Sequence, residues 1–90
     1  MTVGNLGSPL CAELNRLANG GAYPARTAFL DEQGAANAWA GTSGLGLIAA
    51  LNIKYGITNP SSYKDLNTIC NLLAGTTDLA APAALRQRSV

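Results

Sequence analysis

The sequence has no histidine and only two cysteines among its 90 residues. Without histidine, general acid–base chemistry would fall to five carboxylates, namely Glu13, Asp31, Glu32, Asp65 and Asp78. None of them is paired with another carboxylate in a repeated or apolar context, and a nucleophilic cysteine would also need a base. We therefore expect no catalytic residues and a protein that is not an enzyme.

Charged residues are also scarce, at 12% of the chain with a net charge of +1. Nucleic acid binding requires clustered lysine and arginine, whereas the only close basic pair here is Arg86 and Arg88. We interpret that pair as a solvated C-terminal tail. Because a weakly charged surface favours association, we expect protein partners and a homo-oligomer, with no nucleic acid partner.

The chain lacks a long hydrophobic run, since the longest, Leu47 to Leu51, is far short of the roughly 20 residues of a membrane span. The first residues have no basic start and no apolar core, which is not the pattern of a secretion signal. Cys11 and Cys70 have no metal-binding spacing. Both are expected as buried thiols, with one disulfide as the alternative, and no metal or membrane partner is predicted.

What the sequence does contain is internal repetition. Four segments share one pattern, in which a small or apolar residue precedes Asn, and Gly follows after a few mostly apolar residues. The segments are LNRLANG, ANAWAG, LNIKYG and CNLLAG, with the repeated residues Asn15, Asn37, Asn52 and Asn71 and Gly20, Gly41, Gly56 and Gly75.

The second and fourth segments align over a longer stretch. At an offset of 34 residues, Asn37 to Asn52 and Asn71 to Arg86 share eight identities in sixteen positions. We predict one domain over residues 1–90, with duplicated halves at 8–46 and 47–88 behind a flexible N-terminus at 1–7. No stretch alternates at period two, so the predicted fold is all-α, a compact bundle of four to five short helices.

Helix boundaries follow from capping residues. Ser8-Pro9 is typical of a helix start, and Asp31-Glu32 of acidic residues at a second one. Ser62 with Asp65 three residues on resembles a capping box at the start of a third, with Asp in place of the usual Glu. Each repeated Gly is expected to end a helix in the left-handed conformation. The hydroxyls after it, in Thr42-Ser43 and Thr76-Thr77, are predicted to cap the next helix, with Thr77 or Asp78 capping the last one.

The repeated asparagines are the most informative polar residues. We predict that each side-chain amide bonds the backbone of an adjacent turn, the alternative being an indifferent position facing solvent. Trp39 is expected in the core, and Leu45, Ile48, Leu51 and Tyr55 are expected to mark one helix. Tyr23 and Tyr63 lie in or beside the two Pro-containing loops, where they are predicted either to contact a partner or to pack as ordinary loop residues.

The stretch WAGTSGLGL holds three glycines but does not match a nucleotide-binding loop. It lacks the lysine and spacing of a phosphate loop, and no strand precedes it. The aligned stretch LLAGTTDLA has Asp78 where Gly44 stands, which disfavours phosphate and suggests that Gly44 and Gly46 are dispensable. We expect no cofactor and no small-molecule substrate.

The stretches AANAWAGTSGLGLIAALNIKYG and CNLLAGTTDLAAPAALRQ resemble the repeated LN-x-x-AGT-x-x-L pattern of small virion proteins from tailed bacteriophages that infect actinobacteria. The resemblance spans about Leu10 to Arg88, and Asn19-Gly20-Gly21 departs from it. It implies a non-enzymatic structural or assembly role in the tail or on the capsid, with other virion proteins as partners. It also implies location in the virion, assembled in the host cytoplasm. The alternative is a helical protein-binding module that acts through its Pro-containing loops.

Overall fold

The computed structural model describes residues 8–21 and 31–88, which contain five α-helices, one short 3-10 helix and no strand. The elements are α1 (Pro9–Ala18), α2 (Glu32–Ala40), α3 (Leu47–Tyr55), η2 (Pro60–Ser62), α4 (Leu66–Ala74) and α5 (Ala81–Arg86). The all-α prediction is therefore confirmed. Tyr23 and the N-terminal residues 1–7 lie outside the described residues.

Side chains cap three helix starts, but the cap predicted at Ser62 is wrong, because Ser62 lies in η2 and Asp65 is the N-cap residue of α4. The side chains of Ser8, Asp31 and Asp65 occupy the N-cap positions of α1, α2 and α4, and each accepts a hydrogen bond from a backbone N–H in the first turn. Such a cap satisfies one of the four N–H groups that a helix start leaves without a partner. At the other ends, α2, α3 and α4 stop at Gly41, Gly56 and Gly75, with φ of 74°, 115° and 72°.

The predicted hydroxyl caps of α3 and α5 are wrong. The N-cap residues are Gly46 and Ala80, and neither of them caps its helix with a side chain. Thr42 and Thr76 instead donate their hydroxyls to the side-chain oxygens of the asparagines in the preceding helix. Each of these hydroxyls therefore holds the turn to the helix before it and does not cap the helix after it.

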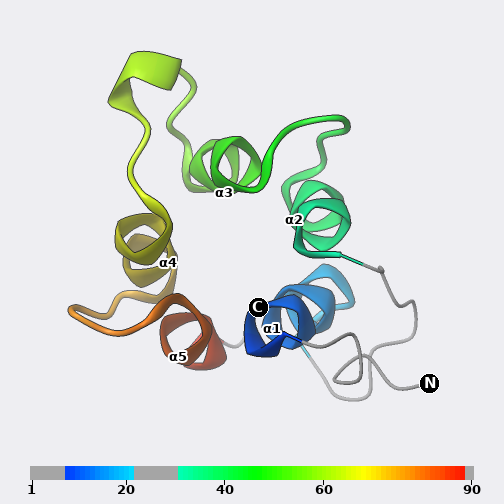
Figure 1. The fold of residues 1–90 in the computed structure, drawn as a ribbon, viewed down its shortest axis with the longest axis vertical. Coiled ribbons are helices and arrows are strands. Elements are labelled where there is room, and N and C mark those ends of the chain that lie inside the picture. The colour runs from blue at the N-terminus through cyan, green and yellow to red at the C-terminus, as the bar shows by residue number, and fades with distance from the viewer. Residues whose placement is uncertain (1–7, 22–30, 89–90) are drawn as a thin grey trace.

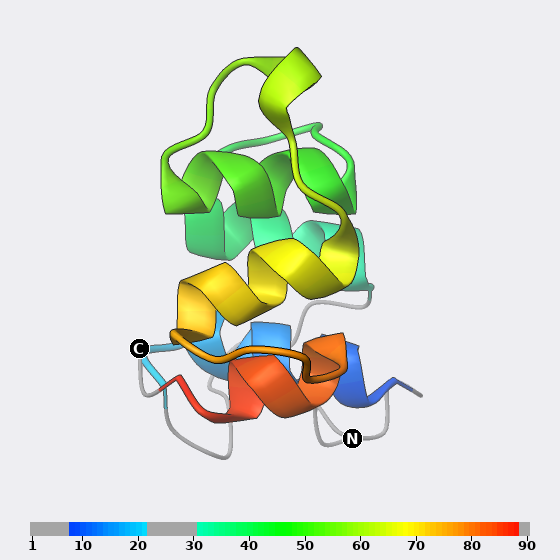
Figure 2. The same cartoon turned by 90° about the vertical axis from the view of Figure 1, so that its left-hand side faces the viewer.

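The five helices form a ring and run in the same direction (Figures 1 and 2). Contacts at both ends of the ring establish this direction. At the N-terminal ends, the Asn67 side chain of α4 accepts from the first N–H of α5, at Ala81. At the C-terminal ends, Arg16 of α1 donates to the carbonyl of Leu85 in α5. Neighbouring helices thus meet start to start and end to end.

The ring is filled by one hydrophobic core to which every helix contributes. Its largest fully buried apolar side chains are Leu14, Leu51, Ile69 and Leu85. Alanines at 35, 36, 50 and 84 are completely buried, which lets the helix axes approach closely. Trp39 is also buried, as predicted.

Of the four residues expected to mark one helix, Ile48, Leu51 and Tyr55 lie in α3, and Leu45 precedes it. Leu51 is fully buried, but Ile48 and Tyr55 are 41% and 47% exposed. They lie seven residues apart on one face of α3, away from the core. The apolar residues of α3 occur almost all round the helix, so their spacing did not distinguish the inner face from the outer one.

Candidate functional site

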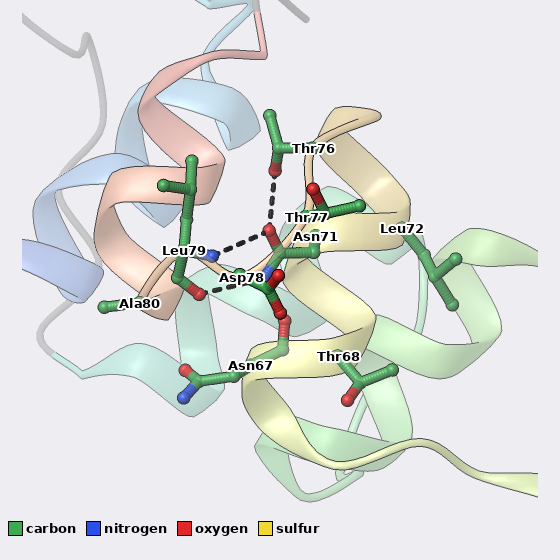
Figure 3. A pocket seen from close by; sticks show the side chains of 9 residues that line it. All are labelled: Asn67, Thr68, Asn71, Leu72, Thr76, Thr77, Asp78, Leu79 and Ala80. Carbon is green, nitrogen blue, oxygen red and sulfur yellow. Dashed lines mark hydrogen bonds between the residues drawn. The ribbon is translucent and has the colours of Figure 1, made fainter.

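The buried asparagines organise the turns, and Asn71 shows the arrangement most fully (Figure 3). Its amide nitrogen donates to the carbonyl oxygens of Asn67 at 2.7 Å and Leu79 at 2.9 Å. Its side-chain oxygen accepts from the Thr76 hydroxyl at 2.8 Å and from the Leu79 N–H at 3.2 Å. One side chain therefore fixes both backbone groups of Leu79, the residue that leads into α5.

Asn37 repeats this set of bonds in the turn between α2 and α3. Its nitrogen donates to the carbonyls of Gln33 and Leu45, each at 2.8 Å. Its oxygen accepts from the Thr42 hydroxyl at 2.8 Å and the Leu45 N–H at 3.2 Å. All four bonds recur at the offset of 34 residues that the sequence alignment identified.

Asn52 bonds the backbone of the longer loop between α3 and α4 in a similar way. Its nitrogen donates to the carbonyls of Ile48 and Lys64, and its oxygen accepts from the Lys64 N–H at 2.8 Å. Asn15 is fully buried and donates to the carbonyl of Cys11 at 2.9 Å. The prediction that these amides bond the backbone of adjacent turns is confirmed for Asn37, Asn52 and Asn71.

Sequence reasoning missed a buried ion pair within α1, whose arginine also contacts the end of α5. Glu13 and Arg16 are 3% and 5% exposed, and their charged groups are 2.9 Å apart. The Arg16 guanidinium also donates to the carbonyls of Gly21, Leu85 and Arg88. The spacing of three residues on one helix was the available signal, but such pairs are ordinary on exposed faces.

Arg88 closes the C-terminal end of the ring, so the prediction of a solvated tail is wrong for this residue. Its guanidinium donates to the Leu73 carbonyl at 2.6 Å and lies 5.2 Å from the ring centroid of Trp39. The ammonium of Lys54 lies at the same distance from that ring. Arg86, by contrast, is exposed, with its Nε 3.4 Å from Glu13.

Both cysteines are buried thiols, and they form no disulfide with each other. Burial raises the pKa of the Cys70 thiol to about 12. Burial and the nearby carboxylates of Glu32 and Asp31 raise the pKa of Cys11. These shifts disfavour the thiolate, the nucleophilic form of cysteine. Among the described residues no three His, Cys, Asp or Glu side chains gather in a way that would hold a metal, and no helix there is long and apolar enough to cross a bilayer.

Two open grooves lie beside the asparagine-anchored turns. The α4 groove, about 530 Å³, runs between α4 and the turn before α5, and the α2 groove, about 470 Å³, runs between α2 and the turn before α3. Seven lining positions coincide at the offset of 34 residues, from Gln33 with Asn67 to Gly44 with Asp78. Tyr63, a predicted partner contact, is half-buried and lines neither groove, and Tyr23 lies outside the described residues.

Position 44 has the same backbone conformation as the equivalent position 78. Gly44 and Asp78 both adopt the left-handed conformation, with φ of 75° and 59°. Because the turn with Asp78 keeps the same four hydrogen bonds, this position does not require glycine.

No protein-family model, curated protein or solved structure matched the chain. The function must therefore be argued from the residues themselves.

Proposed function

We propose that this protein is a non-enzymatic structural or assembly protein of a tailed-phage particle, tail-associated or decorating the capsid. The observation that carries the proposal is how its buried polar side chains are used. Six are buried in the described residues, namely Glu13, Asn15, Arg16, Asn37, Asn52 and Asn71. Each bonds the chain's own backbone or a partner charge within the fold.

Such use of polar groups suits a rigid building block. A catalytic site commonly holds side chains with perturbed pKa values whose charge is available to a substrate. Here the buried amides are committed to turns, and the two thiols are held in their neutral form. The repeated sequence pattern resembles that of small virion proteins, and for this reason we propose that the structural role is in a phage particle.

The exposed apolar side chains support contact with other proteins. Ile48, Tyr55 and Leu72 are 41%, 47% and 39% exposed. The weak overall charge of the chain does little to oppose association. Copies of this chain and other virion proteins are the partners that we propose, with the virion as its location.

Mass spectrometry of purified phage particles tests the proposal. The chain should be found in particles that remain after gradient purification and nuclease treatment, at a constant ratio to the major capsid protein across preparations. Its absence from intact particles, while it accumulates in infected cells, would contradict a virion role.

One observation favours the alternative of a protein-binding module that acts through a loop. Asn52 fixes the backbone of Lys64, and the loop between them carries η2 away from the ring (Figure 1). Residues 58–62 of this loop are all exposed. Replacing Pro60, Ser61 and Ser62 with glycine would abolish partner capture under the alternative, whereas incorporation into particles would continue under the proposed function.

A further inference from the structure

Comparing the two equivalent grooves shows which residues hold the turn in both and which residues differ between them. Both grooves keep the residues that hold the turn, Asn37 with Thr42 in one and Asn71 with Thr76 in the other. Because both turns have the same four hydrogen bonds, residues that differ between the grooves are not required for the fold of the turn. Most of those differences lie at exposed positions, including the ones between Ala38 and Leu72 and between Gly44 and Asp78.

The first difference is an apolar side chain. Leu72 of the α4 groove is 39% exposed, and Ala38 occupies the equivalent position of the α2 groove. Leu72 extends outward from α4, on the side of Asn71 opposite to Thr76 and Leu79 (Figure 3). A large apolar side chain left in water gains free energy when a partner covers it.

The second difference is an acidic residue in a costly conformation. Asp78 has φ of 59° and stands where the α2 groove has Gly44. A left-handed conformation is unfavourable for a residue with a side chain, although Asp tolerates it better than most. The α4 groove therefore combines an exposed apolar side chain with an exposed carboxylate, and the α2 groove has neither at these positions.

The same chain also carries a surface that is complementary to the α4 groove, on the outer side of α3. Ile48 and Tyr55 expose one face of α3, and the backbone of Lys64 is fixed beside that face by Asn52, which lies between them on the helix. Lys64 itself is exposed. The turn after α4 lies on the side of α4 away from α3 (Figure 1), and none of Ile48, Tyr55 and Lys64 lines the α4 groove.

We propose that the outer face of α3 in one copy docks into the α4 groove of a second copy. Ile48 and Tyr55 would cover Leu72, and Lys64 would approach Asp78. Because the two surfaces differ, the contact is heterologous and builds a ring or an open filament rather than a two-fold dimer. The inference rests on the proposed function only in expecting this chain to assemble with copies of itself.

Sedimentation velocity of the full chain over a range of concentrations tests the docking. The wild type should form complexes larger than a dimer, and added salt should weaken them because opposite exposed charges are screened. The variant L72A/D78G carries the residues of the α2 groove, and its association constant should fall about tenfold or more. The matched control Ala38→Ser changes the α2 groove and should associate like the wild type.

A charge exchange makes the test specific for the two surfaces. Asp78→Lys and Lys64→Glu should each weaken association alone, and an equimolar mixture should restore it, because a basic groove then meets an acidic helix face. Thermal melting should show that every variant is folded. A monomeric wild type at all concentrations, or L72A/D78G complexes as stable as those of the wild type, would overturn the proposal, as would capture of a different protein by Leu72 without self-association.

The two proposals fail separately. A chain that is present in purified particles but monomeric in solution would retain the proposed function and lose the docking contact. A chain that assembles through Leu72 and Asp78 but is absent from particles would retain the docking contact and lose the virion role.

Discussion

At the scale of single residues, the side-chain amide of asparagine matches a specific demand of these turns. Leu45, Lys64 and Leu79 each have a backbone carbonyl and a backbone N–H directed at one asparagine. Only an amide both donates and accepts at the required reach, since a carboxylate accepts alone and a hydroxyl offers a single atom. The recurrence of Asn in the sequence pattern follows from this geometry.

We expect Asn71→Ala to lower the free energy of unfolding by about 1–3 kcal/mol, because it leaves both backbone groups of Leu79 without their partner. Asn71→Asp should also destabilise, since a carboxylate cannot donate to the carbonyls of Asn67 and Leu79. Urea denaturation measures both. Asn59→Ala is the control, because Asn59 is exposed and its side chain caps only the short η2. Equal losses for Asn71→Ala and Asn59→Ala would contradict the assigned role.

At the scale of helices and turns, most boundaries were predictable because they depend on local chemistry. Ser8, Asp31 and Asp65 cap helix starts, and glycines in the left-handed conformation end α2, α3 and α4. The partners of Thr42 and Thr76 were not predictable in this way. A hydroxyl next to a helix start usually caps it, but here a buried amide in the preceding helix competes for the same hydroxyl.

Gly41 and Gly46 form a matched pair within one turn. Gly41 has φ of 74° and Gly46 has φ of −66°, and a Cβ atom would meet no atom within 4 Å at either position. Gly41→Ala should therefore cost about 1 kcal/mol from the left-handed backbone alone, whereas Gly46→Ala should be nearly neutral or slightly stabilising. Chemical denaturation of the two variants decides this. A neutral Gly41→Ala would mean that the turn relaxes into another conformation.

The Asp65 cap makes a prediction about pH. The hydrogen bond from the Thr68 N–H lowers the pKa of Asp65 in the folded protein. A lowered folded pKa gives stability that is present above the unfolded pKa, near 3.9, and is lost as pH falls through the folded value. Asp65→Asn keeps a capping side chain without the charge, so it should melt below the wild type at neutral pH. The two melting temperatures should converge in acid, and a gap that is unchanged with pH would exclude this contribution.

At the scale of the whole molecule, the helices run parallel although their connections are short. Six residues join α2 to α3, at 41–46, and another six join α4 to α5, at 75–80. Short helix connections usually join antiparallel neighbours. Here a nine-residue helix is about 13 Å long, and six extended residues reach about 20 Å, so the turn can run back along the helix that it leaves. The side chains of Asn37 and Asn71 bond the backbone of these two turns and hold each turn along the helix that precedes it.

The parallel arrangement also explains where charges lie. Aligned helix dipoles place partial positive charge at one end of the ring and partial negative charge at the other. Asp31, Glu32 and Asp65 stand at helix starts, while Arg16, Lys54 and Arg86 stand in last turns. Each charge opposes the partial charge of its own helix end. This distribution was present in the sequence, but it became interpretable only once the helix directions were known.

The ion pair between Glu13 and Arg16 lies where α1 packs against α5. Removing one partner leaves a buried charge, so Arg16→Met should destabilise by about 3–5 kcal/mol. Glu13→Gln combined with Arg16→Met should cost less than the sum of the single changes, because no charge then remains unpaired. Additive losses in such a double-mutant cycle would show that the pair does not couple. Arg86→Ala, at an exposed partner, should have a small effect.

The sequence predicted the helices, much of the core and the asparagine anchors, since these depend on local pattern and repetition. It did not predict the ring, the closing role of Arg88 or the exposed side of α3. Each of these depends on which distant residues meet. Leu73, Trp39 and Arg88 are far apart in the chain and come together only at the C-terminal ends of parallel helices.

Nuclear Overhauser contacts of the single tryptophan test the parallel ring most directly. Trp39 lies near the end of α2, and the charged groups of Lys54 and Arg88 each lie 5.2 Å from its ring centroid. The account predicts cross-peaks from the indole protons to the side chains of Lys54 and Arg88. Cross-peaks to the first turn of α3, at Leu47 and Ile48, with none to Lys54 or Arg88, would show an antiparallel pair and contradict it.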